Sequence, residues 1–250
     1  MNLSGRKLAL MTGGSRGLGF ECAKGLRAQG FDLILVAKDS ARLEAATAAL
    51  RSDGRSEMVI AYPIDLEDSD STSAKLEVIS SSHPDISHLI LAHGVMSEKM
   101  SKTLKTNDAE WRRVMSINLD SVFQIVNRLA PALVEARNGR IIIFSACLGR
   151  MSGPGNAGGL APYRISKAGV NALVRNLAHE TGLGARGVLV DAICPNHSRT
   201  DMGGPDAPRS AEEGAETAMW LATREFDKDS AEVQKNTTGV LWEDRQVVPW

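Results

Sequence analysis

A glycine-rich turn near the start of the chain limits the possible folds more than any other feature. It reads T-G-G-S-R-G-L-G from Thr12 to Gly19, directly after an apolar run and directly before a helical pattern. Glycine permits a tight turn and a close approach of the backbone to a ligand. A phosphate can then lie at the N-terminus of the following helix, where amide groups lack partners. Gly13, Gly17 and Gly19 therefore predict a strand–turn–helix unit that suits a dinucleotide pyrophosphate.

Short apolar runs alternate with amphipathic segments along the whole chain. The candidate strands are Lys7–Thr12, Phe31–Ala37, Glu57–Ile64, Leu89–His93, Arg140–Ser145, Val188–Cys194 and Gly239–Trp242. The candidate helices are Gly17–Gln29, Ser40–Ser52, Ser69–Ser81, Asp108–Ala136, Pro162–Leu183 and Ala211–Ala222. Several strands are continuous apolar runs, which is typical of a parallel sheet buried on both faces. The alternation predicts a doubly wound α/β sheet that binds ligands beyond the carboxyl ends of its strands.

One domain spanning residues 1–250 accounts for the chain. We find no internal repeat and no linker, and 250 residues suffice for a full-sized core. Two irregular segments, Ser152–Leu160 and Gly203–Arg209, would lie above the sheet on the ligand side. We expect a segment at about 198–215 to cover the substrate.

The composition argues against several functional classes. A net charge of −1 shows no basic excess for nucleic acid. No apolar run approaches the length that spans a bilayer, and a signal peptide at the N-terminus would consume the first strand, so we expect neither. Cys22, Cys147 and Cys194 show no metal-binding or disulfide spacing, which favours a reducing cytoplasm. We also expect no metal site.

The charges after the second strand indicate which dinucleotide binds. An acidic residue there accepts from the 2′-hydroxyl of NAD, whereas a basic residue suits the 2′-phosphate of NADP. The strand ends in Val36-Ala37-Lys38-Asp39, and Arg16 lies inside the glycine turn. Two cations, Lys38 and Arg16, favour NADP(H). Asp39, one position later, is the main argument for NAD.

Tyr163 and Lys167 form a Y-x-x-x-K pair, and residues four apart share one face of a helix. A free tyrosine titrates near pH ~10. A neighbouring ammonium favours the phenolate and lowers the pKa of the phenol. Such a group can give a proton to a carbonyl oxygen as hydride arrives, or take one in the reverse direction.

With these motifs, the chain resembles the short-chain dehydrogenase/reductase family, and specifically its carbonyl-reductase-like members. The resemblance covers nearly the whole length and implies a Rossmann-like parallel sheet of seven strands in the order 3-2-1-4-5-6-7. Its elements are the glycine turn, Asp65-Leu66, Asn118 in Ser116-Ile117-Asn118-Leu119, Tyr163-Arg-Ile-Ser-Lys167, Cys194-Pro195, Arg199-Thr200-Asp201 and the C-terminal Trp242-Glu-Asp-Arg.

The resemblance also implies roles for individual residues. Asp65 would contact adenine, and Asn118 would hold a water that links Lys167 to solvent. Lys167 would also bind the nicotinamide ribose, Thr200 the carboxamide or pyrophosphate, and Tyr163 would be the acid/base. The residues expected at the cofactor are Gly13, Ser15, Arg16, Gly17, Leu18, Gly19, Lys38, Asp65, Leu66, Gly94, Tyr163, Lys167, Pro195 and Thr200.

The chain departs from the family where a catalytic serine usually ends the fifth strand. Alignment on Gly149 places Ala146 there, and Ser145 matches the preceding serine. Side chains of a strand alternate between its faces, so Ser145 would point elsewhere unless a bulge intervenes. We keep Ser145 as a candidate catalytic residue, and Ser152 in the glycine-rich loop is a further candidate.

Other departures bring two histidines near the cleft. The usual Asn-Asn-Ala-Gly becomes Leu91-Ala92-His93-Gly94, and Asn196-His197 follows Pro195 in place of a glycine. His197 is a candidate catalytic residue that donates to a substrate oxygen or acts as a separate acid/base near neutral pH, or else it is a loop histidine held by backbone atoms. We expect His93 to make a structural bond at a strand end. Cys147 either lines the pocket or is an inert buried thiol.

These observations favour an NADP(H)-dependent oxidoreductase that reduces a C=O bond, or a related C=N or conjugated C=C bond, of a small organic molecule. Loss of one oxyanion donor costs about 10²–10³ in rate, which weakens a ketone reductase without excluding one. A non-redox cyclase, isomerase or dehydratase that retains the cofactor is the second hypothesis. A binding protein that senses NADP(H) is the third. The family resemblance implies a homodimer or homotetramer formed through the long helices Asp108–Ala136 and Pro162–Leu183.

Overall fold

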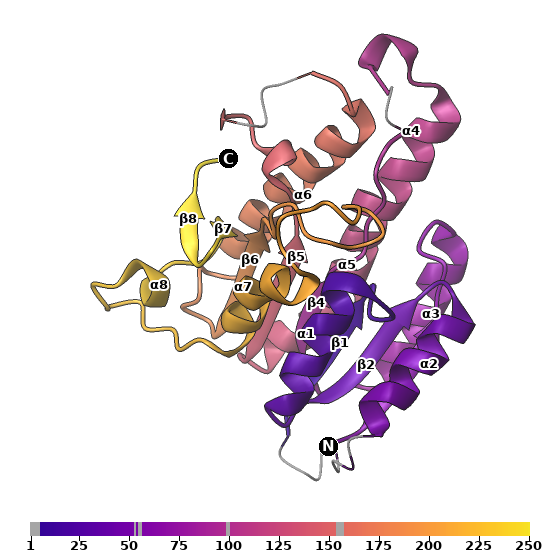
Figure 1. Ribbon diagram of the computed structural model, residues 1–250. Helices are drawn as coiled ribbons and strands as arrows, with labels where there is room; N and C mark the ends of the chain where they lie inside the picture. The colour runs from indigo at the N-terminus through magenta and orange to yellow at the C-terminus, as the bar shows by residue number, and fades with distance from the viewer. Residues whose placement is uncertain (1–5, 53, 55–56, 99–100, 154–157) are drawn as a thin grey trace.

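One continuous sheet organises the molecule. The computed structural model describes residues 6–52, 54, 57–98, 101–153 and 158–250. Within them the sheet has eight strands in the order β3-β2-β1-β4-β5-β6-β7-β8 (Figure 1). The strands are β1 (Leu8–Thr12), β2 (Asp32–Ala37), β3 (Val59–Pro63), β4 (Ile86–Leu91), β5 (Gly139–Phe144), β6 (Val188–Ile193), β7 (Leu241–Glu243) and β8 (Gln246–Val248).

Strands β1 to β7 run parallel, and β8 pairs antiparallel with β7. This arrangement confirms the predicted doubly wound sheet and its order 3-2-1-4-5-6-7. It adds β8, which the sequence did not indicate. Asp244 and Arg245 form the two-residue turn before β8 with φ of 51° and 61°. Such a turn usually contains Asn-Gly or Asp-Gly, and this chain lacks that signal.

Helices cover both faces of the sheet. They are α1 (Gly17–Ala28), α2 (Ser40–Arg51), α3 (Ser69–Ser82), α4 (Asp108–Met115), α5 (Ser121–Glu135), α6 (Ala161–Glu180), α7 (Ala211–Thr223) and α8 (Val233–Asn236). One hydrophobic core joins the sheet to α3, α5 and α6, and a second joins it to α1, α2 and α7. Figure 1 shows α1 and α7 in front of the sheet. The continuous apolar strands are buried from both sides, as their sequences predicted.

The helical segment 108–135 is not uniform. A π-helical turn, η2 (Ser116–Asp120), separates α4 from α5 and contains the buried Asn118. Single π turns inside helices are frequent at functional sites because they redirect one side chain. The predicted helix Asp108–Ala136 therefore exists, but with an irregularity at the residue that the family resemblance singles out.

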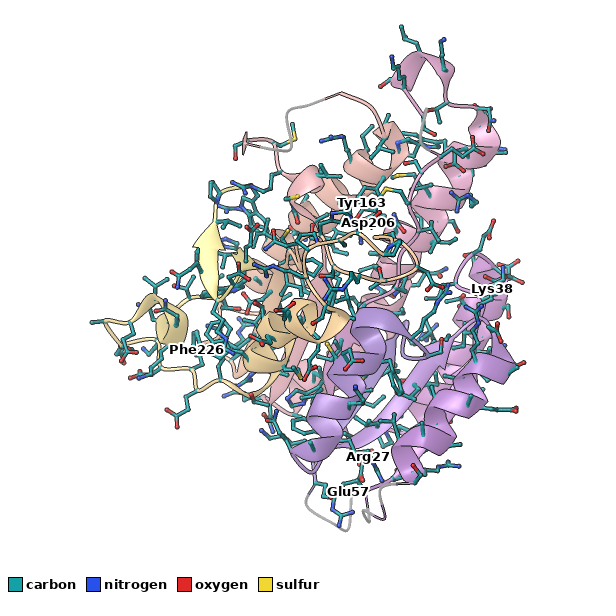
Figure 2. All side chains as sticks on the ribbon, viewed as in Figure 1. Arg27, Lys38, Glu57, Tyr163, Asp206 and Phe226 are labelled. Atoms are coloured by element: carbon teal, nitrogen blue, oxygen red, sulfur yellow. The ribbon has the colours of Figure 1, made fainter. Side chains whose placement is uncertain are left out.

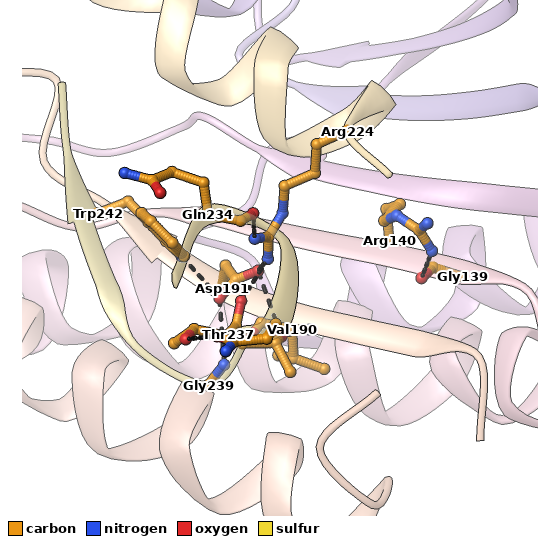
Figure 3. A network of polar contacts seen from close by, with 11 residues as sticks. Gly139, Arg140, Val190, Asp191, Arg224, Gln234, Thr237, Gly239 and Trp242 are labelled. Carbon is orange, nitrogen blue, oxygen red and sulfur yellow. Dashed lines mark hydrogen bonds and ion pairs between the residues drawn. The ribbon is translucent and has the colours of Figure 1, made fainter. Parts of the chain in front are cut away.

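A buried network ties the C-terminal segment to β6 (Figure 3). Arg224 donates to Asp191 Oδ2 at 2.9 Å and to the carbonyl of Thr237 at 2.7 Å. Trp242 Nε1 donates to Asp191 Oδ1 at 2.9 Å. The guanidinium lies over the rings of Trp220 and Trp242, 5.1 and 4.9 Å from their centroids. These contacts compensate the buried charges and fix the strand order on this side of the sheet.

Strand β4 begins three residues earlier than its sequence indicates. Its first part, Ile-Ser-His, looks polar, but His88 is buried and its Nε2 lies 3.0 Å from the carbonyl of Ala222. Burial lowers the pKa of His88 to about 3, so the ring is neutral. Across the described residues, we find no helix with the length and apolar character needed to cross a bilayer.

Candidate functional site

An open cleft lies at the carboxyl ends of β1 to β4. Its volume is about 670 Å³, and its walls come from the glycine turn, the end of β2, the segments after β3 and β4, and the segment after β6. The predicted cofactor residues that line it are Gly13, Ser15, Arg16, Gly17, Leu18, Gly19, Lys38, Asp65, Leu66, Gly94 and Thr200. Lys38, which follows β2 directly, is labelled on the right of Figure 2. The structure therefore brings these eleven residues into one cavity.

The glycine turn forms a cradle that other residues would fill. Gly13 and Gly17 have φ of 65° and 55°, in the region that favours glycine. A Cβ on Gly19 would lie 2.4 Å from the carbonyl oxygen of Gly13. Helix α1 begins after Arg16 and has no side-chain cap, so its first amides keep their capacity to bind an anion. The turn thus fits a pyrophosphate.

Three cations surround the β2 end of the cleft. Arg16 pairs with Asp201, and Arg42 Nη1 lies 3.7 Å from the same carboxylate. Lys38 Nζ lies 2.7 Å from Asp65 Oδ2, and this hydrogen bond raises the pKa of Lys38. Sequence reasoning identified Arg16 and Lys38 but missed Arg42. The sequence could have indicated Arg42 by its position, because it lies in the first turn of α2, the helix that directly follows β2.

Asp39 has a structural task that the sequence did not reveal. Its carboxylate accepts the amide of Arg42 at 3.0 Å and caps α2. Its second oxygen lies 3.4 Å from Arg42 Nε. An N-cap aspartate stabilises the helix end by about 1 kcal/mol. The acidic residue that argued for NAD is therefore engaged with α2, which weakens that argument.

The predicted acid/base pair, Tyr163 and Lys167, lies beyond the inner end of the cleft, on α6. Tyr163 is only 6% exposed, and its amide donates to Ser97 Oγ at 2.9 Å. Lys167 is 4% exposed, and its Nζ donates to the carbonyl of Phe144 at 2.7 Å and lies 6.0 Å from the centroid of the Tyr163 ring. A Cβ on Gly94 would lie 3.5 Å from Nζ, so Gly94 connects the cavity to this pair. Figure 2 marks Tyr163 on the α6 side of the molecule.

The titration of this pair differs from the sequence prediction. Burial raises the pKa of Tyr163 above its usual range, and the nearby Cys194 and Cys147 raise it further. Burial lowers the pKa of Lys167 to about 8. We expected the ammonium to lower the pKa of the phenol. In this structure the ammonium is directed at the Phe144 carbonyl, so desolvation of the phenolate dominates.

Asn118 is fixed by three hydrogen bonds. Its Oδ1 accepts the amide of Val95 at 2.8 Å, and its Nδ2 donates to the Val95 carbonyl at 2.9 Å and to Ser166 Oγ at 3.0 Å. A Cβ on Gly94 would lie 3.4 Å from its Oδ1. Asn118 therefore joins the segment after β4 to α6 and keeps the inner end of the cleft in place.

The residues after β5 lack a serine that faces the pair. Ser145 Oγ donates to Asn171 Oδ1 at 2.5 Å and lies 3.3 Å from the carbonyl of Lys167. The pairing of β5 with β6 has no bulge, so Ser145 keeps the face that strand alternation assigns to it. Ala146, which the family resemblance places at the usual serine position, carries no hydroxyl. The buried Ser152 Oγ has no hydrogen-bond partner among the described residues.

The two histidines near the cleft have different surroundings. His197 is exposed, and its Nε2 donates to the carbonyl of Gly203 at 2.7 Å. His93 lies between Thr12 Oγ1, 2.6 Å from Nδ1, and Ser121 Oγ, 2.8 Å from Nε2. Burial, aided by the charge of Lys167, lowers the pKa of His93 to about 3. His93 therefore makes the structural bonds that we expected at a strand end.

The segment after β6 contributes both the cleft wall and a turn. Asn196 adopts φ of 58°, which explains why glycine, or asparagine as here, suits this position. Pro195 lies outside the cavity, and its carbonyl accepts Ser198 Oγ at 3.0 Å. Thr200 lines the cavity, and its Oγ1 accepts the amide of Gly203 at 3.1 Å.

Comparison with known proteins agrees with this geometry. Residues 7–211 match the family model of short chain dehydrogenase. The 3-oxoacyl-[acyl-carrier-protein] reductase FabG of Escherichia coli (strain K12) is 32% identical over 202 residues, covering 81% of this chain and 77% of that protein. A solved short chain dehydrogenase/reductase family protein superimposes with a TM-score of 0.78 at 25% identity, covering 97% of this chain and 96% of the other.

A further solved structure shares the fold at lower identity. It is described as a short chain dehydrogenase from Shigella flexneri 2a complexed with NADP. Its TM-score is 0.78 at 21% identity, covering 94% of this chain and 95% of the other. The family match spans most of the chain and includes the glycine turn, Asn118 and the Tyr163–Lys167 pair. The chain belongs to the short-chain dehydrogenase family of oxidoreductases.

Proposed function

We propose that the protein is an NADP(H)-dependent reductase of a C=O bond in a small organic molecule. The observation that carries this proposal is the position of Gly94, which lines the dinucleotide-sized cleft and whose Cβ would lie 3.5 Å from Lys167 Nζ. The cleft therefore ends at the acid/base pair. Because the curated relative at 32% identity is named a 3-oxoacyl-[acyl-carrier-protein] reductase, 3-oxoacyl thioesters are the first substrates to test. C=N and conjugated C=C bonds require the same hydride and proton.

The residues of the cleft fit the cofactor part by part. Gly13, Gly17 and Gly19 leave room for a pyrophosphate at the start of α1. Arg16, Lys38 and Arg42 supply the positive charge that a 2′-phosphate requires. The remaining proposed contacts are Ser15 and Leu18 in the turn, Asp65 and Leu66 at adenine, Gly94 and Lys167 at the nicotinamide ribose, and Pro195 and Thr200 at the nicotinamide. When bound, the reduced nicotinamide supplies the hydride.

The chain's own residues supply and control the proton. Burial keeps the phenol of Tyr163 protonated at neutral pH, so it can donate to a substrate oxygen that gains negative charge. The ammonium of Lys167 stabilises the phenolate that remains. Asn118 holds the segment after β4 against α6 through its three hydrogen bonds. Ser145 is engaged with Asn171, so it has no step in this mechanism.

His197 takes a positioning role in this proposal. Its hydrogen bond to Gly203 closes the turn after β6, and Arg199 donates to the carbonyls of Ala207 and Pro208. An isolated bridge joins Ser198 to Arg209. These contacts hold the segment at about 198–215 in a compact form above the sheet. We propose that this segment covers the substrate, and His197→Ala should then change KM more than kcat.

An assembly through α4, α5 and α6 is the second part of the proposal. Phe123 on α5 is 53% exposed, and Trp111 and Ile165 on α4 and α6 are also exposed. Exposed large apolar side chains are frequent at protein interfaces. We propose a homodimer or homotetramer with this face buried. Sedimentation should show an oligomer that Phe123→Glu dissociates, and a monomeric wild type would refute it.

Ala146 favours one alternative, a non-redox enzyme that retains the cofactor. Without the usual serine, the site lacks a second hydroxyl donor beside Tyr163, which weakens the stabilisation of an oxyanion that ketone reduction requires. Such an enzyme would convert a substrate without net consumption of NADPH.

A turnover screen separates the two functions. Purified protein and NADPH are incubated with 3-oxoacyl thioesters, simple ketones, aldehydes and imines, and both NADPH absorbance and product are followed. The proposal predicts stoichiometric NADPH consumption with at least one carbonyl class, abolished in Tyr163→Phe. Product formation without NADPH consumption would instead establish the non-redox alternative, and neither change would refute both.

A further inference from the structure

Two cysteines meet where β5 and β6 end. Phe144, the last residue of β5, pairs with Ile193, the last residue of β6. Cys194 follows β6 directly, and Cys147 begins the short helix η3 (Cys147–Gly149). The amide of Cys147 donates to Cys194 Sγ at 3.0 Å. The parallel strands thus bring together two cysteines that lie 47 residues apart in the chain.

The two thiols differ in exposure and acidity. Cys194 is 2% exposed, whereas Cys147 is only half-buried. The hydrogen bond from Cys194 is the main cause that holds the pKa of Cys147 well below its usual range. The same bond, together with burial, raises the pKa of Cys194. Cys147 is the more exposed thiol and the one that peroxide reaches first, and the buried Cys194 is placed as its resolving partner.

We propose that Cys147 and Cys194 are a peroxide-sensitive thiol pair that closes reversibly into a disulfide where η3 packs on α6 at Lys167 and switches off the site. The Cys147 thiolate attacks one oxygen of hydrogen peroxide. The O–O bond breaks, hydroxide leaves and becomes water, and a sulfenic acid remains on Cys147. The Cys194 sulfur then attacks that sulfur, the S–O bond breaks, and a second water leaves with the thiol proton. Two electrons pass from the sulfur pair to peroxide, and a dithiol reductant returns them.

The position of η3 explains why this disulfide changes the active site. Cys147 begins η3, and the last residue of that short helix packs on α6, which carries Tyr163 and Lys167. Gly149, the last residue of η3, packs so closely on α6 that a Cβ there would lie 2.6 Å from the Cβ of Lys167. An S–S bond of about 2.05 Å is much shorter than a contact between two thiols. Its formation draws the start of η3 toward β6 and disturbs the packing on Lys167.

Cys22 provides a matched control within the same chain. It lies in α1, on the other side of the sheet from α6, and burial raises its pKa to about 12. It is therefore an unreactive thiol. Cys22→Ala removes it without touching the pair.

The test treats the reduced full-length protein and Cys22→Ala with hydrogen peroxide. Free thiols are counted after denaturation, and cross-linked peptides are mapped by mass spectrometry without reduction. We expect the three thiols of the wild type to fall by two, with one cross-link that joins Cys147 to Cys194 and disappears with dithiothreitol. Cys22→Ala should give the same cross-link. Cys194→Ser should stop at a sulfenic acid that dimedone traps on Cys147. Absence of that cross-link, or a cross-link through Cys22, would overturn the proposal.

The functional arm compares oxidised and reduced protein. The turnover measurement rests on the proposed reductase function, whereas the formation of the disulfide does not. A displacement of catalytic groups by about 1 Å costs up to about hundredfold in rate, so we expect at least about a tenfold loss that dithiothreitol reverses. Should the reduced protein show no turnover, the reductase proposal fails, and NADPH affinity decides the switch instead. A cross-link that changes neither turnover nor NADPH affinity would overturn the switch.

Discussion

Removal of Arg42 and Arg16 should convert selectivity for NADPH into near indifference between NADPH and NADH. Both guanidinium groups are more than half exposed, and both approach the carboxylate of Asp201. Unit charges 4 Å apart attract by about 1 kcal/mol in water and about 4 kcal/mol near a protein surface. The 2′-phosphate carries nearly two negative charges, which strengthens its attraction to each arginine. Each arginine must, however, leave its ion pair with Asp201 to reach the phosphate, and this reduces the net binding energy.

We therefore expect each arginine to contribute about 1.4 kcal/mol to the free energy of NADPH binding, which corresponds to about tenfold in Kd. Arg42→Ala should therefore weaken NADPH binding about tenfold, and the double variant with Arg16→Ala about thirtyfold to a hundredfold. NADH lacks the 2′-phosphate and should change by less than about twofold. Asp201→Asn should act in the opposite direction and tighten NADPH binding, because it frees both arginines.

Fluorescence titration with each nucleotide, at low and high salt, measures these constants. Arg112→Ala is the matched control, since Arg112 is an exposed arginine on α4 paired only loosely with Asp108 at 3.9 Å. Higher salt should reduce the effect of both cleft arginines. Equal weakening of NADPH and NADH would show that the arginines bind the shared pyrophosphate. A wild type that prefers NADH would refute the assignment of NADP(H).

Three further predictions concern the cradle, the buried network and the catalytic lysine. Gly19→Ala places a Cβ 2.4 Å from the Gly13 carbonyl oxygen, so it should destabilise the fold by about 1–3 kcal/mol in denaturant unfolding. In nucleotide titrations it should weaken the binding of both NADPH and NADH, in contrast to Arg42→Ala. Arg224→Met leaves Asp191 buried without its cation and should cost about 3–5 kcal/mol in urea unfolding, while an unchanged midpoint would contradict the role of the network. Lys167 has a folded pKa of about 8 against 10.5 for the free side chain, so the unfolded state binds more protons between these values. The stability difference between wild type and Lys167→Met should therefore shift by up to about 3 kcal/mol in favour of wild type as pH rises from 8 to 10.5, and a flat difference would contradict the buried lysine.

The architecture could be predicted because it follows from patterns that extend over many residues. Continuous apolar strands and amphipathic helices alternate, and this alternation predicted a doubly wound sheet, whereas the order of β1 to β7 came from the family resemblance. Strand β8 was missed because Asp244 and Arg245 adopt a turn normally signalled by glycine or asparagine. The start of β4 was missed because a buried His88 looks polar until its partner, the Ala222 carbonyl, is known.

The candidate site was predictable where the residue type itself restricts the geometry. The glycine turn was predictable because only glycine permits its geometry. The orientation of Ser145 away from the cleft was predictable because side chains alternate along a strand. The role of Asp39 as a helix cap, and the contribution of Arg42, depended on three-dimensional proximity. The pKa of Tyr163 could not be predicted from the Y-x-x-x-K spacing, because burial and the direction of the Lys167 side chain decide it.

Transfer of deuterium from C4-deuterated NADPH to product tests the central claim most directly. With the carbonyl substrate found in the turnover screen, the wild type should give an alcohol that carries one deuterium on the former carbonyl carbon for each NADPH oxidised. Tyr163→Phe should bind NADPH as tightly as the wild type but transfer almost none. Product without deuterium, or full transfer by Tyr163→Phe, would contradict a reductase in which this phenol supplies the proton.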